Sequence, residues 1–140
     1  MTFAVYDANV VVSATFWPGA ARRCLKAVAA RHVRLFVTEA ILEEYQRTAE
    51  AVRRRRFPDR NPVPMLSWIE STARLVKPAP LGKRRSRDVT DDPYLAAALA
   101  ARAPHLVSYD NDLLVLEKPF GIQILRPAAF LTWLRSGEVE

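Results

Sequence analysis

The sequence has very few residues of the kinds that cross-link a chain or bind soft metals. Among its 140 residues there are one cysteine, Cys24, and two histidines, His32 and His105. A single cysteine excludes an internal disulfide and a cysteine-based zinc cluster. The longest apolar run, residues 94–101, is far shorter than the roughly 18 residues that a membrane-spanning helix requires. The sequence therefore favours neither a disulfide-stabilised nor a membrane protein.

A secretory signal peptide is not indicated either. Asp7 interrupts the early apolar stretch, and no basic segment precedes it. Half of the residues are hydrophobic and 26% are charged, which excludes a disordered or low-complexity chain. No repeat or linker divides the sequence, so we expect one domain spanning residues 1–140, located in the cytoplasm.

Basic residues outnumber acidic ones, 21 against 15, and give a formal net charge of +6. A basic domain attracts polyanions, of which nucleic acid is the most common in cells. Arginine runs also occur as solvated loops or helix ends, and charge does not distinguish RNA from DNA. We expect the RNA backbone to contact two clusters: Arg53, Arg54, Arg55 and Arg56, and Lys83, Arg84, Arg85 and Arg87.

Strand and helix patterns alternate along the chain. This alternation predicts a three-layer α/β/α sandwich with a mostly parallel central sheet. In such a fold the strand-to-helix connections meet at one sheet edge, where open α/β sheets bind ligands. We expect strands at residues 2–6, 33–37, 74–77, 105–108 and 121–125, and helices at residues 20–30, 39–54, 64–73, 93–101, 111–117 and 127–134.

Three aspartates fall at that edge. Asp7 follows the first strand, Asp110 follows the strand at residues 105–108, and Asp92 stands as N-cap before Pro93. Asp92 is equally explained as an ordinary cap, and Asp110 with Asp112 as a turn. Asp7 is harder to explain structurally, because a carboxylate within an apolar segment must offset an unfavourable desolvation.

The helix at residues 39–54 supplies a fourth carboxylate. At about 100° per residue, its apolar residues form one stripe; Glu44 lies about 110° and Glu43 about 150° from the centre of that stripe. Glu44 therefore borders the buried face, and Glu43 should point to solvent. Thr38 is placed to cap this helix.

Four carboxylates in one cleft would repel, each pair at ~5 Å by about 3 kcal/mol at an effective dielectric of ~20. Either some are protonated or a divalent cation lies among them. An all-oxygen shell suits one or two Mg²⁺ or Mn²⁺ ions, which would activate a water and neutralise a phosphodiester. Asn9 and Ser108 either position carboxylates or stabilise turns. The tryptophans at positions 17, 68 and 133 are interpreted as packing residues, and neither histidine is assigned a catalytic role.

The ordered set of motifs resembles PIN-domain nucleases over nearly the whole chain. The matching segments are Val-Tyr-Asp-Ala-Asn-Val-Val-Val-Ser at residues 5–13, Thr-Glu-Ala-Ile-Leu-Glu-Glu-Tyr at 38–45, Asp-Asp-Pro-Tyr-Leu-Ala-Ala-Ala-Leu at 91–99 and Leu-Val-Ser-Tyr-Asp-Asn-Asp-Leu-Leu at 106–114. The resemblance selects Asp7, Glu44, Asp92 and Asp110 as catalytic metal ligands, with Asp112 as a further ligand.

The resemblance is closest to the toxin components of toxin–antitoxin pairs, the VapC toxins. It implies a Mg²⁺- or Mn²⁺-dependent ribonuclease, often a homodimer, with an antitoxin protein as partner. The sequence departs from the usual pattern at two positions. Ala8 replaces the usual threonine after the first aspartate, and Tyr109 replaces the usual glycine before Asp110.

Other classes fit less well. A phosphoacceptor receiver is excluded because Lys118 follows an expected helix rather than a strand, and a haloacid dehalogenase-type phosphatase would need an aspartate where Asn9 stands. The alternative that stays open is a non-catalytic RNA-binding or regulatory module with the PIN fold. Ala8 and Tyr109 favour it, and metal-dependent activity distinguishes the two.

Overall fold

A computed structural model describes residues 1–82 and 92–139 of the chain. In the described residues, the strands form one sheet in the order β3-β2-β1-β4-β5, and every neighbouring pair is parallel. The fold prediction is therefore confirmed. The strands are β1 (Thr2–Tyr6), β2 (Val33–Val37), β3 (Arg74–Leu75), β4 (His105–Val107) and β5 (Gln123–Leu125).

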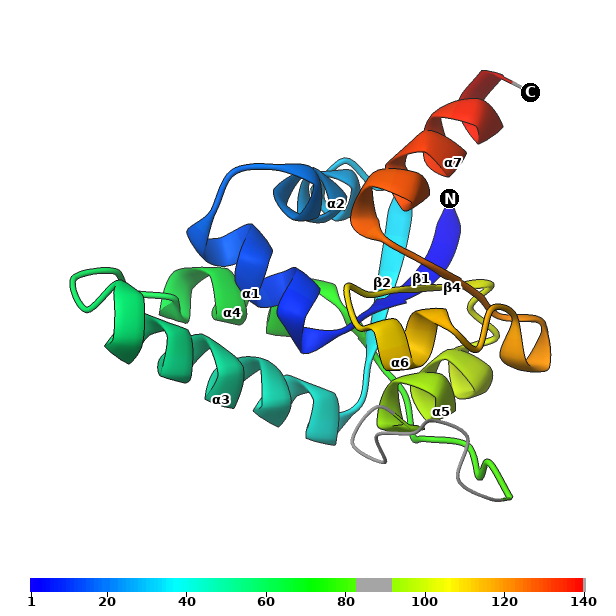
Figure 1. Cartoon of the computed structure of the whole chain (residues 1–140), viewed down its shortest axis with the longest axis horizontal. Helices are drawn as coiled ribbons and strands as arrows, with labels where there is room; N and C mark the ends of the chain where they lie inside the picture. The colour runs from blue at the N-terminus through cyan, green and yellow to red at the C-terminus, as the bar shows by residue number, and fades with distance from the viewer. Residues whose placement is uncertain (83–91, 140) are drawn as a thin grey trace.

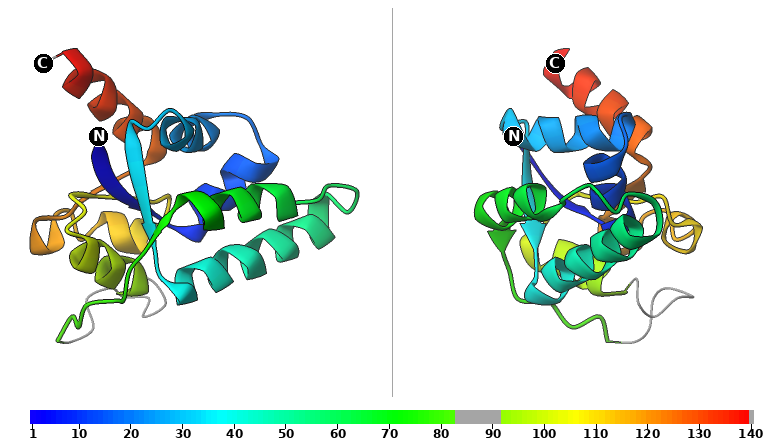
Figure 2. Two further views of the ribbon diagram at one scale, coloured as in Figure 1. Left: turned by 180° about the vertical axis from the view of Figure 1, so that it is seen from behind. Right: turned by 90° about the vertical axis from the view of Figure 1, so that its left-hand side faces the viewer.

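Helices cover both sides of this sheet (Figures 1 and 2). One layer contains α1, α2 and α7, whereas α5 packs against β1, β2 and β4 from the other side. The two helices α3 and α4 pack against each other and extend to one side of the sheet. The helices are α1 (Ala8–Phe16), α2 (Ala20–Ala29), α3 (Glu39–Arg56), α4 (Val63–Thr72), α5 (Asp92–Ala101), α6 (Asn111–Leu114) and α7 (Pro127–Val139), with a 3-10 turn, η2, at Pro119–Gly121.

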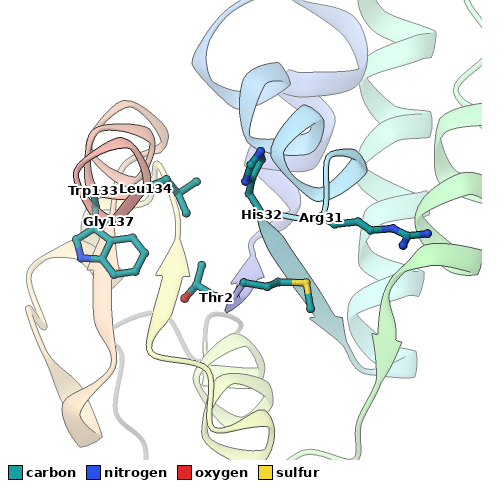
Figure 3. Close-up of a pocket in the computed structure, with 7 residues that line it drawn as sticks. Thr2, Arg31, His32, Trp133, Leu134 and Gly137 are labelled. Carbon is teal, nitrogen blue, oxygen red and sulfur yellow. The ribbon is translucent and has the colours of Figure 1, made fainter. Parts of the chain in front are cut away.

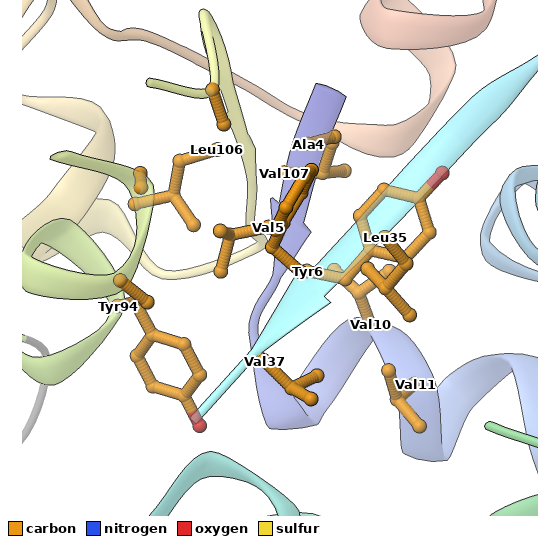
Figure 4. Close-up of a cluster of buried hydrophobic side chains, with 14 of the residues drawn as sticks. Ala4, Val5, Tyr6, Val10, Val11, Leu35, Val37, Tyr94, Leu106 and Val107 are labelled. Carbon is orange, nitrogen blue, oxygen red and sulfur yellow. The ribbon is translucent and has the colours of Figure 1, made fainter. Parts of the chain in front are cut away.

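The core forms around the three inner strands of the sheet, β2, β1 and β4 (Figure 4). Val5 of β1, Leu35 of β2 and Leu106 of β4 are fully or almost fully buried. Each such side chain contributes roughly 1.5–3 kcal/mol to the hydrophobic stabilisation of the fold. The buried Tyr6 hydroxyl donates to the Cys24 carbonyl oxygen at 3.0 Å, which ties β1 to α2. This packing fixes the end of β1, where Asp7 stands.

Two elements were not expected from the sequence, helix α1 and the short η2 turn. Helix α1 begins directly after Asp7, although it contains three consecutive valines, whose branched side chains lower helix propensity. Burial of Val10, Val11 and Val12 outweighs that preference, and the Asp7 side chain caps the helix.

The remaining elements lie close to their expected positions. Helix α3 is two residues longer and α7 five residues longer than expected, and β3 is shorter. Helix α5 begins at Asp92, so the prediction that Asp92 is the N-cap was wrong by one residue. Within residues 1–82 and 92–139, no helix has the length and apolar character needed to cross a membrane.

Candidate active site

Asp7 connects β1 to α1 at the carboxyl edge of the sheet. Its side chain is buried, and its Oδ1 atom accepts a hydrogen bond from the Val10 backbone N–H at 3.0 Å. Its Oδ2 atom accepts a hydrogen bond from the Ser108 hydroxyl, which comes from the end of β4. The Asp7 backbone N–H donates to the Val107 carbonyl at 3.0 Å. The carboxylate is thus held in place by groups from α1 and from the end of β4.

Burial raises the pKa of Asp7 from 3.8 to about 6. The hydrogen bonds from Ser108 and the Val10 N–H lower this pKa, the negative charge of Asp110 raises it, and the Asn9 N–H lowers it slightly. Asn9 acts here through its backbone, while its side chain is exposed. Because burial makes ionisation of this carboxylate unfavourable, a nearby cation would strongly stabilise its charged form.

Asp110 approaches Asp7 through a turn that Ser108 organises. The Ser108 oxygen accepts a hydrogen bond from the Asp110 N–H at 2.8 Å, while its hydroxyl donates to Asp7. Asp110 then caps α6, since its Oδ1 accepts from the Asp112 N–H at 2.8 Å. Three predicted site residues, Ser108, Asp110 and Asp112, are therefore linked to one another, and the first two interact with Asp7.

Two buried tyrosines contact the residues on either side of Asp7, and neither was predicted from the sequence. The Tyr94 hydroxyl of α5 accepts a hydrogen bond from the Ala8 N–H at 3.2 Å (Tyr94 is drawn in Figure 4). The Tyr45 hydroxyl of α3 donates to the Tyr6 carbonyl at 2.6 Å. The sequence signal that could have found these residues is a tyrosine within an apolar helix face, because a buried hydroxyl requires a hydrogen-bond partner. Asp92 opens α5 two residues before Tyr94, at the same edge of the sheet.

Glu44 occupies the helix face that its sequence position predicts. It is half-buried, whereas Glu43 is exposed. Its carboxylate forms an ion pair with Arg47, and its Oε1 atom accepts a hydrogen bond from the Thr48 hydroxyl at 3.3 Å. Both partners belong to α3, so Glu44 is engaged along its own helix.

Asp7 and Asp110 lie close enough to interact electrostatically, whereas Glu44 pairs with Arg47. Among the described residues, no group of three or more His, Cys, Asp or Glu lies close enough together to hold a metal ion.

The basic clusters lie apart from Asp7 or outside the described residues. Lys83, Arg84, Arg85 and Arg87 belong to the segment that is not described. Arg53 and Arg54 pair with Glu50 at 2.7 and 3.0 Å, and the Arg56 guanidinium lies 5.6 Å from the centre of the Trp17 ring. Arg55 is exposed. Twelve helical residues separate Glu44 from Arg56, a span of about 18 Å.

A cavity of about 420 Å³ lies at the opposite edge of the sheet, between the start of β1 and α7 (Figure 3). Thr2, His32 and Trp133 are among its lining residues, and none of the predicted site residues lines it. It is therefore separate from the carboxylates around Asp7.

Comparison with known proteins agrees with this fold. The PIN domain family matches residues 4–112, so the chain belongs to the PIN-domain family. The chain is similar to a protein of known structure, PAE2754 from Pyrobaculum aerophilum, with a TM-score of 0.63 at 18% identity, covering 96% of this chain and 90% of that one. The search of curated proteins found no match. PIN domains are generally nucleases and usually use divalent metals.

The donor atoms at this site fit a hard divalent cation. Asp7 and Asp110 are carboxylates and offer only oxygen ligands, and the Asp7 oxygens accept hydrogen bonds from Val10 and Ser108. Mg²⁺ is commonly bound by one or two carboxylates, with waters and substrate phosphate completing its shell. A pair of aspartates at the sheet edge meets that requirement.

Proposed function

We propose that the protein is a Mg²⁺- or Mn²⁺-dependent endoribonuclease that hydrolyses RNA phosphodiesters. One observation carries the proposal: the buried Asp7 carboxylate is joined to Asp110 through Ser108 at the carboxyl edge of a PIN-family sheet. A buried carboxylate with a raised pKa beside a second carboxylate is a candidate functional group.

Each residue has a distinct role in this proposal. Asp7 and Asp110 would hold the metal, Asp92 and Asp112 would supply further oxygens at the same edge, and Glu44 would contribute its carboxylate in place of its ion pair with Arg47. One or two divalent ions held there would supply activation of a water and neutralisation of charge on the phosphate. Ser108 orients Asp7, and the Asn9 N–H adds to the hydrogen bonds that Asp7 receives. The two arginine- and lysine-rich clusters guide the RNA backbone.

Cleavage of a labelled mixed-sequence RNA tests this proposal. The expected result is cleavage in Mg²⁺ or Mn²⁺, none in EDTA, and recovery when the metal is added back in excess. A DNA strand of the same sequence serves as the matched substrate. Preferential cleavage of the DNA strand would contradict the assignment to RNA, and cleavage in EDTA would contradict the role of the metal.

We further propose that this nuclease is the toxin of a toxin–antitoxin pair and acts in the cytoplasm as a homodimer. The support is the resemblance of the motifs at Asp7, Glu44, Asp92 and Asp110 to the toxin group. Induced expression should arrest growth of a bacterial host, and Asp7→Asn should relieve the arrest at equal protein level. Copurification with a small partner protein from the native host tests the antitoxin, and light scattering tests the dimer.

A second candidate, an RNA-binding module without catalysis, is favoured by one observation. The Glu44 carboxylate is engaged by Arg47 and Thr48, so it is not available to a cation in this arrangement. RNA that is bound but stays intact across a series of divalent metals would support this candidate.

A further inference from the structure

Tyr109 and Arg126 leave adjacent strands side by side, close to Asp7. The Ser108 N–H donates to the Leu125 carbonyl at 3.0 Å, which continues the pairing of β4 with β5 by one step. In this register Arg126 lies opposite Ser108, and Tyr109 is the next residue after Ser108. The Ser108 hydroxyl also donates to the Asp7 carboxylate. Tyr109 and Arg126 therefore both neighbour a residue that contacts Asp7.

We propose that Tyr109 and Arg126 form a nucleotide subsite beside Asp7, where Tyr109 stacks on a base of single-stranded RNA and Arg126 binds an adjacent phosphate. This proposal rests on the proposed function and names how the substrate is held. It assigns a role to two residues that the metal site does not use.

The Tyr109 side chain is partly exposed, and its hydroxyl forms a hydrogen bond. It is 37% exposed, although Ser108 before it is completely buried. Burial raises the pKa of the Tyr109 phenol, and the Ser13 hydroxyl, which donates to it from α1, lowers that pKa. The negative charge of Asp7 raises the pKa of the phenol and the positive charge of Arg126 lowers it. An aromatic ring held in this way loses little conformational entropy when a base stacks on it.

The Arg126 side chain is likewise held by a hydrogen bond. Its Nη2 atom donates to the Asn111 Oδ1 atom at 2.8 Å, at the start of α6, and the residue is exposed. A guanidinium has five N–H donors in a planar fork, so several stay available for the oxygens of a phosphate. A positive charge bonded to Asn111, the residue after Asp110, also offsets the repulsion between the carboxylates of the site and an approaching RNA backbone.

Two other exposed aromatic side chains, Trp133 and Phe3, lack this combination. Trp133 is 39% exposed, but its ring packs on His105 with centroids 4.1 Å apart, at the cavity on the far edge of the sheet (Figure 3). Phe3 is 38% exposed and packs on Phe36 at 4.9 Å. Tyr109 differs from both because it stands beside Asp7 and an arginine.

The test measures stacking directly in EDTA, where the RNA stays intact. A set of eight-nucleotide RNAs carries 2-aminopurine at one position each, and its fluorescence falls when the base stacks on an aromatic ring. The wild type and Tyr109→Phe should quench one position strongly, and Tyr109→Leu should not. Tyr109→Leu should weaken binding about 10-fold, as loss of one stacked base does. Arg126→Gln should weaken binding and lower the salt slope by about 0.7.

Matched variants control for general effects on the surface. Phe3→Leu removes an aromatic ring of nearly the same exposure, and Arg135→Gln removes an exposed arginine on α7. Both should bind as the wild type does. An RNA that is abasic at the quenched position provides a test on the unmodified protein. It should bind about 10-fold more weakly to the wild type and not more weakly to Tyr109→Leu.

The outcomes separate this proposal from the proposed function. If Tyr109→Leu binds and quenches as the wild type does, or the abasic RNA binds normally, the subsite is overturned although metal-dependent cleavage persists. If the Tyr109 effects appear and the RNA stays intact in every metal, the subsite stands and the ribonuclease proposal fails. If the wild type binds no RNA, both fail.

Discussion

The Ser108 hydroxyl donates a hydrogen bond to Asp7 Oδ2 and so joins the end of β4 to the end of β1. The same oxygen accepts the Asp110 N–H, which brings the second aspartate toward the first. A single buried hydroxyl thereby fixes both carboxylates that fit a metal ion, although they lie about a hundred residues apart in the sequence.

Ser108→Ala should therefore damage both stability and activity. The variant leaves one Asp7 oxygen and the Asp110 N–H without this partner, which should lower the free energy of unfolding by about 1–3 kcal/mol. It should also reduce RNA cleavage by 10-fold or more, because the two carboxylates lose their common support. Urea unfolding and cleavage rates check this, with Ser136→Ala, an exposed serine on α7, as control. Unchanged cleavage in a folded Ser108→Ala protein would contradict the positioning role.

Asp7→Asn should stabilise the metal-free protein at neutral and alkaline pH. The pKa of Asp7 is about 6 in the folded state against 3.8 as the ordinary value, so its ionisation costs stability as the pH rises through this interval. The cost reaches up to about 3 kcal/mol above pH 7, and the neutral amide avoids it. The gain of Asp7→Asn over the wild type should be small at pH 4 and largest at pH 8.

Urea unfolding in EDTA at several pH values measures that difference. Asp59→Asn, which changes an exposed aspartate, should shift the stability by less than about 0.5 kcal/mol at every pH. An Asp7→Asn variant that is no more stable than the wild type at pH 8 would contradict the conclusion that ionised Asp7 destabilises the metal-free protein.

Glu44→Gln and Glu43→Gln form a matched pair of neighbouring substitutions. Glu44 is half-buried at the helix face toward the site, and Glu43 points to solvent. Glu44→Gln should raise the Mg²⁺ concentration needed for half-maximal cleavage several-fold, while Glu43→Gln should leave it unchanged. Arg47→Ala should lower that concentration, because it releases Glu44 from its ion pair. A metal titration of cleavage decides this, and equal effects of the two glutamates would be inconsistent with a role for Glu44.

His105 should make the protein sensitive to mild acid. Its ring is buried against Trp133 and Phe130, its Nδ1 atom has no hydrogen-bond partner within residues 1–82 and 92–139, and burial lowers its pKa below 6.5. A lowered pKa means that this histidine supports the fold above pH 6.5 and opposes it as the pH falls through the folded-state pKa. The stability of the wild type relative to His105→Phe should thus fall between pH 7.5 and pH 5.

Urea unfolding at these two pH values checks the prediction, and His32→Gln, at an exposed histidine, is the control. Because Asp7 acts in the opposite direction, only the difference between wild type and variant isolates His105. A difference that is the same at both pH values would show that the ring titrates normally.

The parts of this fold that follow a single periodicity could be predicted from the sequence. The bounds of β1 and β2 agree with the expected strands, and Thr38 caps α3 by accepting from the Ile41 N–H at 3.1 Å. The different exposure of Glu43 and Glu44 also followed from helix geometry.

Long-range packing accounts for what the sequence did not reveal. Helix α1 was missed because its valines favour a strand and only burial on several sides makes them helical. The contacts of Tyr94 with Ala8 and of Ser108 with Asp7 join residues 86 and 101 positions apart, which no local pattern reports. The pairing of Glu44 with Arg47 was visible as an i, i+3 spacing, but its competition with a metal was not.

We propose above all that Asp7 is a metal ligand required for cleavage of RNA. The most direct test compares the wild type with Asp7→Asn on one labelled single-stranded RNA in Mg²⁺, after both proteins are shown to be folded and to bind that RNA in EDTA. We expect the wild type to cleave and Asp7→Asn to bind the RNA but cleave it at least 100-fold more slowly. Equal cleavage by the two proteins would contradict the claim.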